Sequence, residues 1–247
     1  MTRVWAVIPV KHTGRSKQRL ADVLTPDERE RLTLAMLHDI LNILRGTDRM
    51  KGILVATRSP QIRDVATGLG AEVLAESAGA SHSMAVSQAC AHLCSHHNAS
   101  TAIILPGDIP RVTSQDIDGL IAGHIAGDDC ITLVPDARGE GTNAILASPP
   151  DAIKFSFGAQ SLQRHFDSAR NDGIVPRIVM NEKLSLDIDY PDDLIRAAVE
   201  LRPSRSVTSR FLEESGIAAR LGVCNDARSP TPNPNPNPIS DTASPCA

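Results

Sequence analysis

Aromatic residues are scarce in this chain, because its 247 residues include one Trp, one Tyr and four Phe. Val, Ile, Leu and Ala must therefore fill most of any core. Hydrophobic residues still make up 41% of the chain, an ordinary share for a globular protein. The length is enough to bury a full core and suits one α/β domain.

The sequence has no run of about 18 consecutive apolar residues, so we do not expect a transmembrane helix. The N-terminal residues also lack the basic, apolar and small-residue layout of a signal peptide. We therefore expect a cytoplasmic protein. In that compartment its cysteines are reduced thiols. They are Cys90, Cys94, Cys130, Cys224 and Cys246.

An excess of positive charge is absent as well, since the formal net charge is −4. This balance gives no reason to expect nucleic acid or an anionic membrane as a partner, so an anionic substrate would need a local basic cluster. The chain has no P-loop motif and no G-x-G-x-x-G fingerprint. It also lacks the G-x-S-x-G signature of serine nucleophiles.

Short apolar runs alternate with segments of helical periodicity along most of the chain. The expected strands cover residues 3–10, 52–57, 71–75, 101–105, 130–134 and 176–180, and the expected helices cover 26–45, 60–69, 83–96, 114–126, 162–172 and 192–201. This alternation predicts an α/β fold with a mostly parallel central sheet and helices on both faces. Ligands of such sheets bind at the carboxyl ends of the strands.

The composition changes near Gly222, and a Pro-Asn repeat occupies residues 231–238. This repeat has no apolar side chain to bury, so it predicts an extended, disordered tail. We therefore expect a folded domain over residues 1–221 and a Pro/Asn-rich tail over residues 222–247.

A basic segment follows the first predicted strand and contains Lys11, Arg15, Lys17 and Arg19. Such a loop at the rim of a sheet can hold a triphosphate and stabilise its departure, because Lys and Arg donate charged hydrogen bonds to phosphate. Gly14 suits a phosphate-binding loop. The alternative is a solvated basic loop with no ligand.

Carboxylates in two segments are candidates for a metal site. Asp108 follows a predicted strand in Leu105-Pro106-Gly107-Asp108-Ile109-Pro110, where it could bind Mg²⁺ or simply form a turn. Asp187 and Asp189 are two residues apart, so in an extended segment they point the same way and repel each other unless a cation lies between them. Asp192 and Asp193 are better explained as residues that begin a helix.

Two segments rich in small and hydroxyl-bearing residues could bind a second anion through N–H and O–H groups. They read Gly141-Thr142-Asn143-Ala144 and Phe157-Gly158-Ala159-Gln160-Ser161, and on their own they would be ordinary turns. Cys90 and Cys94, with the nearby histidines, have no second ligand pair at the spacing of a zinc site, so we do not expect a metal there.

Six motifs occur in a characteristic order: Val-Ile-Pro-Val-Lys, Lys-x-Arg-Leu, Leu-Pro-Gly-Asp-Ile-Pro, Gly-Thr-Asn-Ala, Phe-Gly-x-x-Ser and Leu-Asp-Ile-Asp-x-Pro-x-Asp-Leu. Over about residues 3 to 201, this set resembles the CofC/FbiD guanylyltransferases of coenzyme F-420 biosynthesis. The resemblance implies a nucleotide-diphospho-sugar transferase-like (Rossmann-like) fold. It also implies transfer of GMP from GTP to 2-phospho-L-lactate, phosphoenolpyruvate or 3-phospho-D-glycerate.

By the same resemblance, Thr142, Gly158 and Ser161 would hold the phospho acid. Mg²⁺ would bind Asp108 together with Asp187 or Asp189, and the triphosphate would face Lys11, Lys17 and Arg19. Lys17, Arg19 and Asp108 would act in catalysis. A homodimer is one candidate assembly.

The segment Ser81-His82-Ser83-Met84-Ala85-Val86 departs from the family's frequent Gly-Leu-Asn-Ala-Ala-Leu. We expect it to line the pocket and to alter contacts to guanine or to the acid. The alternative functions are a cytidylyl- or molybdopterin-type nucleotidyltransferase, a glycosyltransferase that uses a nucleotide sugar, and a non-catalytic binding module.

Overall fold

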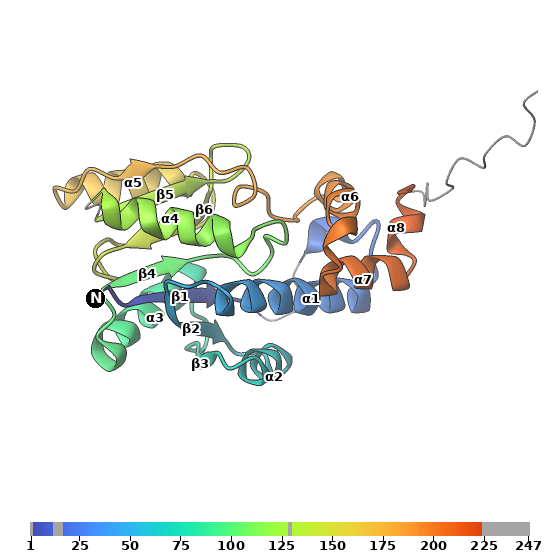
Figure 1. Ribbon diagram of the computed structural model, residues 1–247, viewed down its shortest axis with the longest axis horizontal. Coiled ribbons are helices and arrows are strands. Elements are labelled where there is room, and N and C mark those ends of the chain that lie inside the picture. Colours follow the sequence, from blue (N-terminus) through green and yellow to red (C-terminus); the bar gives the residue numbers. More distant parts are fainter. Residues whose placement is uncertain (1, 12–16, 128–129, 224–247) are drawn as a thin grey trace, which may run out of the picture.

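A central sheet organises the computed structural model, which describes residues 2–11, 17–127 and 130–223 (Figure 1). Its strands, in chain order, are β1 (Val4–Pro9), β2 (Met50–Thr57), β3 (Glu72–Ala75), β4 (Thr101–Ile104), β5 (Ile131–Pro135), β6 (Thr142–Ala147) and β7 (Arg177–Ile178). Within the described ranges they are ordered β3-β2-β1-β4-β6-β5-β7. β6 runs antiparallel to both of its neighbours, whereas the other pairings are parallel. The predicted mostly parallel sheet is confirmed.

Helices cover both faces of this sheet, as the alternating pattern predicted. The α-helices are α1 (Pro26–Arg45), α2 (Pro60–Gly68), α3 (His82–His97), α4 (Ser114–Ala126), α5 (Ser161–Asn171), α6 (Pro191–Glu200), α7 (Val207–Glu214) and α8 (Ile217–Arg220), and short 3-10 helices lie at η2 (Gln18–Leu20) and η3 (Arg202–Ser204). One hydrophobic cluster joins the sheet to α1, α2 and α4, and a second joins the other face to α3 and α5.

The alternation of side chains along β1 explains how one strand serves both clusters. Val4, Ala6 and Ile8 pack in the cluster on the α1 side, whereas Trp5 and Val7 pack in the cluster on the α3 side. Successive residues of a strand point to opposite faces, so a strand between two helical layers must be apolar throughout. The whole of β1 is indeed buried.

The helix expected over residues 26–45 is found as α1, and its bounds have local causes. Thr25 and Glu28 form a capping box, Pro26 occupies the first turn, and Gly46 follows the last residue. Met84, near the start of α3, is 51% exposed although its side chain is apolar. The buried residues of this helix begin at Ala85.

Two C-terminal helices, α7 and α8, were not expected from the sequence. Together with α6 they pack against the first half of α1 and form a third apolar cluster, at the far end from the N-terminus in Figure 1. The buried carboxylate of Asp39 on α1 accepts hydrogen bonds from the backbone N–H groups of Val207 and Thr208, at 2.8 Å each. This long-range cap fixes the start of α7.

The described chain ends at Val223, whose side chain is buried in the third cluster. Most of the predicted tail, residues 224–247, lies outside the described residues. Among the helices that the structure describes, none is both long and apolar enough to cross a membrane.

Candidate active site

Asp108 lies at the sheet edge formed by the carboxyl ends of the parallel strands. Leu105 continues β4 by donating its N–H to the carbonyl of Val7 at 3.0 Å, and the chain then turns at Gly107. A Cβ at Gly107 would lie 3.3 Å from Val10 Cγ2. Glycine therefore lets the turn approach the end of β1 closely, which carries Asp108 over the rim.

The segment that contains Asp187 and Asp189 lies against the same turn. The N–H of Ile188 donates to the carbonyl of Asp108 at 3.2 Å, and the Ile188 side chain is fully buried. Both flanking carboxylates therefore point away from the core toward Asp108. Carboxylate oxygens of the three residues lie within 4.8 Å of one another, so the predicted convergence of Asp187 and Asp189 on one side is confirmed.

Lys17 is the cation that neutralises this group in the structure. Its Nζ donates to the carboxylate of Asp108 and, at 3.0 Å, to Asp189. Burial would lower the pKa of Lys17, but Asp108 and Asp189 outweigh burial and raise this pKa to about 12. Arg19 Nη1 pairs with the other oxygen of Asp189 at 3.0 Å and remains 59% exposed, so it has N–H groups free for a ligand.

The donor set fits a hard divalent cation such as Mg²⁺, which prefers carboxylate oxygen. Asp108 Oδ1 is buried and has no hydrogen-bond partner among the described residues. Burial, with repulsion from Asp108 and Asp189, raises the pKa of Asp187 to about 6. A divalent cation would satisfy the unpartnered oxygen of Asp108 and offset the repulsion among the three carboxylates.

A cluster of small polar groups adjoins the carboxylates because β6 is antiparallel to its neighbouring strands. Its first residues therefore lie at the same rim as the last residues of the parallel strands. Asn143 Nδ2 donates to the Leu184 carbonyl at 3.1 Å and to Asp187 Oδ1 at 3.3 Å, which ties β6 to the metal candidates. Thr142, Asn143 and Ala144 thus lie in strand β6, where a turn was the simple expectation.

The predicted acid-binding residues come together beside Asn143. Thr142 N–H donates to Ser161 Oγ at 2.9 Å, and Ser161 N–H donates to the Gly158 carbonyl at 3.1 Å. Gly158 has φ of 109°, a conformation that favours glycine. A Cβ at this glycine would lie 3.4 Å from Arg164 Nη2, so a guanidinium that the sequence analysis missed stands next to the loop.

His165 is a second residue that the sequence analysis missed, and it positions this loop. Ser156 N–H donates to His165 Nε2 at 2.8 Å, so Nε2 is the unprotonated nitrogen. Nδ1 therefore carries the proton and donates to Thr142 Oγ1 at 3.1 Å. Burial, with the nearby charge of Arg164, lowers the pKa of His165 to about 4.

Lys11 lies apart from the carboxylates, in a neighbouring pocket. A cavity of about 420 Å³ is lined by Lys11, Arg58, Glu76, Ser77, Gly79 and Ala80. Gly14 and Arg15 of the predicted phosphate loop lie outside the described residues.

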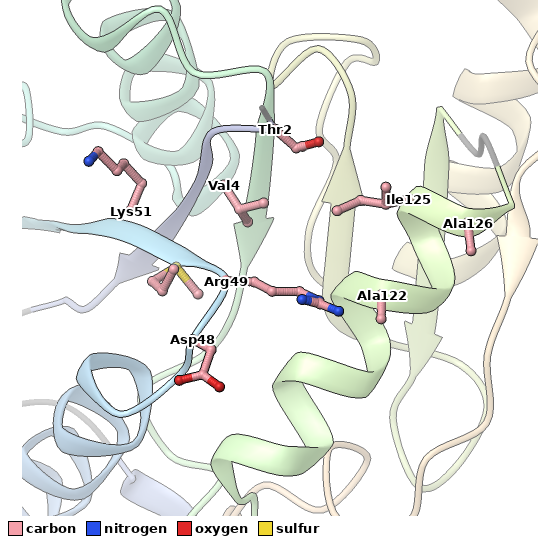
Figure 2. Close-up of a pocket in the computed structure, with 9 residues that line it drawn as sticks. Thr2, Val4, Asp48, Arg49, Lys51, Ala122, Ile125 and Ala126 are labelled. Atoms are coloured by element: carbon pink, nitrogen blue, oxygen red, sulfur yellow. The ribbon is translucent and has the colours of Figure 1, made fainter.

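Two other features lie at the opposite edge of the sheet, away from these residues. A cavity of about 790 Å³ is lined by residues at the starts of β1 and β2 and the end of α4, including Val4, Arg49 and Ile125 (Figure 2). His97 Nε2 lies 3.0 Å from a carboxylate oxygen of Glu72, and with His92 these residues place possible ligand atoms within 4.8 Å of one another. Cys90 is not part of this group, because it is buried against the sheet.

Comparison with known proteins shows the family to which this chain is similar. A family model described as "Guanylyl transferase CofC like" matches residues 4–228. The phosphoenolpyruvate guanylyltransferase of Conexibacter woesei is 37% identical over 77% of this chain and 85% of its own length. The 3-phospho-D-glycerate guanylyltransferase of Phenylobacterium zucineum is 31% identical over 78% of this chain and 88% of its own.

Solved structures agree on the fold at lower identity. A protein from Desulfovibrio desulfuricans G20, described as a nucleotide-diphospho-sugar transferase, superposes with a TM-score of 0.68 at 16% identity, over 90% of this chain and 99% of the other. A cytidylyltransferase from Leptospira borgpetersenii gives 0.59 at 13% identity, over 90% and 97%. These likenesses confirm the nucleotide-diphospho-sugar transferase-like architecture.

Proposed function

Since the chain belongs to the CofC-like guanylyltransferases and is a nucleotidyltransferase, we propose that it transfers GMP from GTP to a three-carbon phospho acid and releases pyrophosphate. The candidate acceptors are phosphoenolpyruvate, 3-phospho-D-glycerate and 2-phospho-L-lactate, and the reaction would serve coenzyme F-420 biosynthesis. The relatives named above are a phosphoenolpyruvate and a 3-phospho-D-glycerate enzyme, which supports the acceptor class.

The observation that carries this proposal is the convergence of Asp108, Asp187 and Asp189, with Asn143 of β6 donating to Asp187 beside the hydroxyl groups of Thr142 and Ser161. Asn143 connects the two parts through its hydrogen bond to Asp187. A transferase of this kind must hold two anions, the triphosphate and the acid, within reacting distance. We assign the triphosphate to the basic residues Lys11, Lys17 and Arg19, the acid to Thr142, Gly158 and Ser161, and the cation to the carboxylates.

In the proposed reaction, a phosphate oxygen of the acid attacks the α-phosphorus of GTP. The new P–O bond forms as the bond to the β-phosphate breaks, and pyrophosphate carries away the electron pair. Thr142, Gly158 and Ser161 hold the acid, and Arg164 adds positive charge at Gly158. Such a transfer depends on positioning and charge neutralisation and needs no protein nucleophile.

Asp108 with Asp187 or Asp189 would hold Mg²⁺. When bound, Mg²⁺ neutralises the phosphate oxygens and favours departure of pyrophosphate. Lys17 keeps the carboxylates from repelling one another, and Arg19 directs its exposed guanidinium toward the phosphates. Lys11, which lines the neighbouring pocket, would face the triphosphate.

The choice of acid depends on the loop around Gly158 and on the divergent segment that begins at Ser81. Ser83 Oγ accepts a hydrogen bond from Phe157 N–H at 2.9 Å, and the His82 ring lies edge-on to Phe157 at 4.8 Å. The segment therefore contacts and supports the loop that would hold the acid.

Product analysis tests the proposal directly. GTP and Mg²⁺ are incubated with the three acids at equal concentration, and products are identified by mass spectrometry, with CTP in place of GTP as the matched control. We expect a guanylylated acid and pyrophosphate with GTP, and no cytidylylated product. A cytidylylated product would favour the alternative transferase, and no product with either nucleotide would refute nucleotidyl transfer to these acids.

A further inference from the structure

A pocket beside the carboxylates is built from the residues that follow three adjacent strands. Lys11 follows β1, Arg58 follows β2 and Glu76 follows β3, and all three line the cavity of about 420 Å³. Small-molecule pockets commonly measure ~300–1,000 Å³. Its place at the carboxyl ends of the sheet is where ligands of such folds bind.

Glu76 is the unusual residue in this pocket. Its Oε1 is buried and has no hydrogen-bond partner among the described residues, although a buried carboxylate oxygen is costly to leave unpaired. Burial raises the pKa of Glu76, while Lys11 and Arg58 oppose that rise. Two nearby cations therefore favour the ionised form, yet neither gives Oε1 a hydrogen bond.

The edge of guanine offers the groups that such a carboxylate lacks. Its ring N–H and its adjacent amino group are two parallel donors, which match the two oxygens of a carboxylate. Adenine presents an unprotonated ring nitrogen at the same place and would be repelled. We propose that Glu76 recognises the guanine base of GTP by accepting hydrogen bonds from these two groups. This inference rests on the proposed use of GTP.

The surroundings connect this base site to the reacting centre. His82 is the first residue of α3. Burial and the charge of Lys11 lower its pKa to about 4, while the charge of Asp108 opposes this decrease. The neutral His82 imidazole is therefore near enough to both Lys11 and Asp108 for each to influence it. A nucleotide with its base at Glu76 would extend its phosphates past Lys11 toward Asp108.

A comparison of GTP with inosine triphosphate, which lacks only the amino group, isolates this contact. In the wild-type protein we expect kcat/KM for GTP to exceed that for inosine triphosphate by roughly 10- to 100-fold, the range for a lost hydrogen bond to a charged group. In Glu76→Gln this preference should fall toward unity. Glu72→Gln, the same change earlier on β3 and outside the pocket, should keep the wild-type preference.

Calorimetric binding of both nucleotides without the acid separates this inference from the proposed reaction. Loss of the preference in Glu76→Gln binding supports the base site even if no acid is guanylylated. Equal losses for both nucleotides would mean that Glu76 only shapes the pocket, and an unchanged preference would mean that another group reads the base. Either of these two results overturns the inference.

Discussion

The buried imidazole of His165 makes the stability of this protein depend on pH in a way that can be calculated. Its pKa is lowered from 6.5 to about 4 because it is buried near Arg164. Protonation would place a second N–H against the N–H of Ser156, which already donates to Nε2. The unfolded chain therefore takes up the proton first as the pH falls.

The sign and the size of the effect follow from this difference. Neutral His165 contributes fully to the free energy of unfolding above pH 6.5, and this contribution is lost as the pH falls from 6.5 to about 4. A pKa shift of this size corresponds to about 3 kcal/mol. Glutamine at this position can donate and accept the same two hydrogen bonds without titrating. His165→Gln should therefore lose about 3 kcal/mol less than the wild type over this range.

Urea unfolding from pH 7 to pH 4 measures the difference. Thr142→Val serves as the control, because it removes the hydroxyl partner of Nδ1 and keeps the imidazole. This variant should be less stable at every pH but should follow the wild-type pH dependence. Parallel curves for the wild type and His165→Gln would refute the reasoning, since they would show that His165 takes up no extra proton on unfolding.

Two further predictions concern Lys17 and the glycines. Without divalent cation, Lys17→Met should lower the free energy of unfolding by about 2 kcal/mol, a value between those for exposed and for buried ion pairs. Added Mg²⁺ should raise the melting temperature of this variant more than that of the wild type. An equal rise in both proteins would contradict the role of Lys17 at Asp108. Gly52→Ala would place a Cβ 2.4 Å from the Trp5 ring and should cost about 1–3 kcal/mol. The Cβ of Gly68→Ala would meet open space, so this substitution should change the free energy of unfolding little. Similar melting temperatures for the two glycine variants would contradict this prediction.

The sequence allowed the metal candidates to be predicted because their signals are local. A carboxylate after a buried strand lies at a known rim, and a spacing of two places Asp187 and Asp189 on one side of an extended segment. The capping box of α1 is local as well. In each case the deciding contacts lie within a few residues of the motif.

The remaining features depend on contacts between distant segments. Asn143 reaches Asp187 only because β6 is antiparallel, and nothing near Asn143 in sequence specifies that direction. The role of His165 depends on its burial and on Thr142, a partner distant in sequence. The role of Glu76 depends on a buried oxygen that has no hydrogen-bond partner among the described residues. The start of α7 depends on Asp39, 168 residues away. The periodicity and spacing of residues in the sequence do not predict such long-range contacts.

The most direct test of the central claim is the rate of pyrophosphate release from GTP and the preferred acid at saturating Mg²⁺, compared between the wild type and Asp108→Asn. The substitution keeps the size of the side chain and removes the charge that would hold the cation. We expect the rate to fall by ~10²-fold or more, the usual cost of losing one such electrostatic contact. Asp64→Asn, an exposed carboxylate on α2, should leave the rate unchanged. Near-normal turnover by Asp108→Asn would contradict the assignment of this rim as a metal-assisted guanylyl-transfer site.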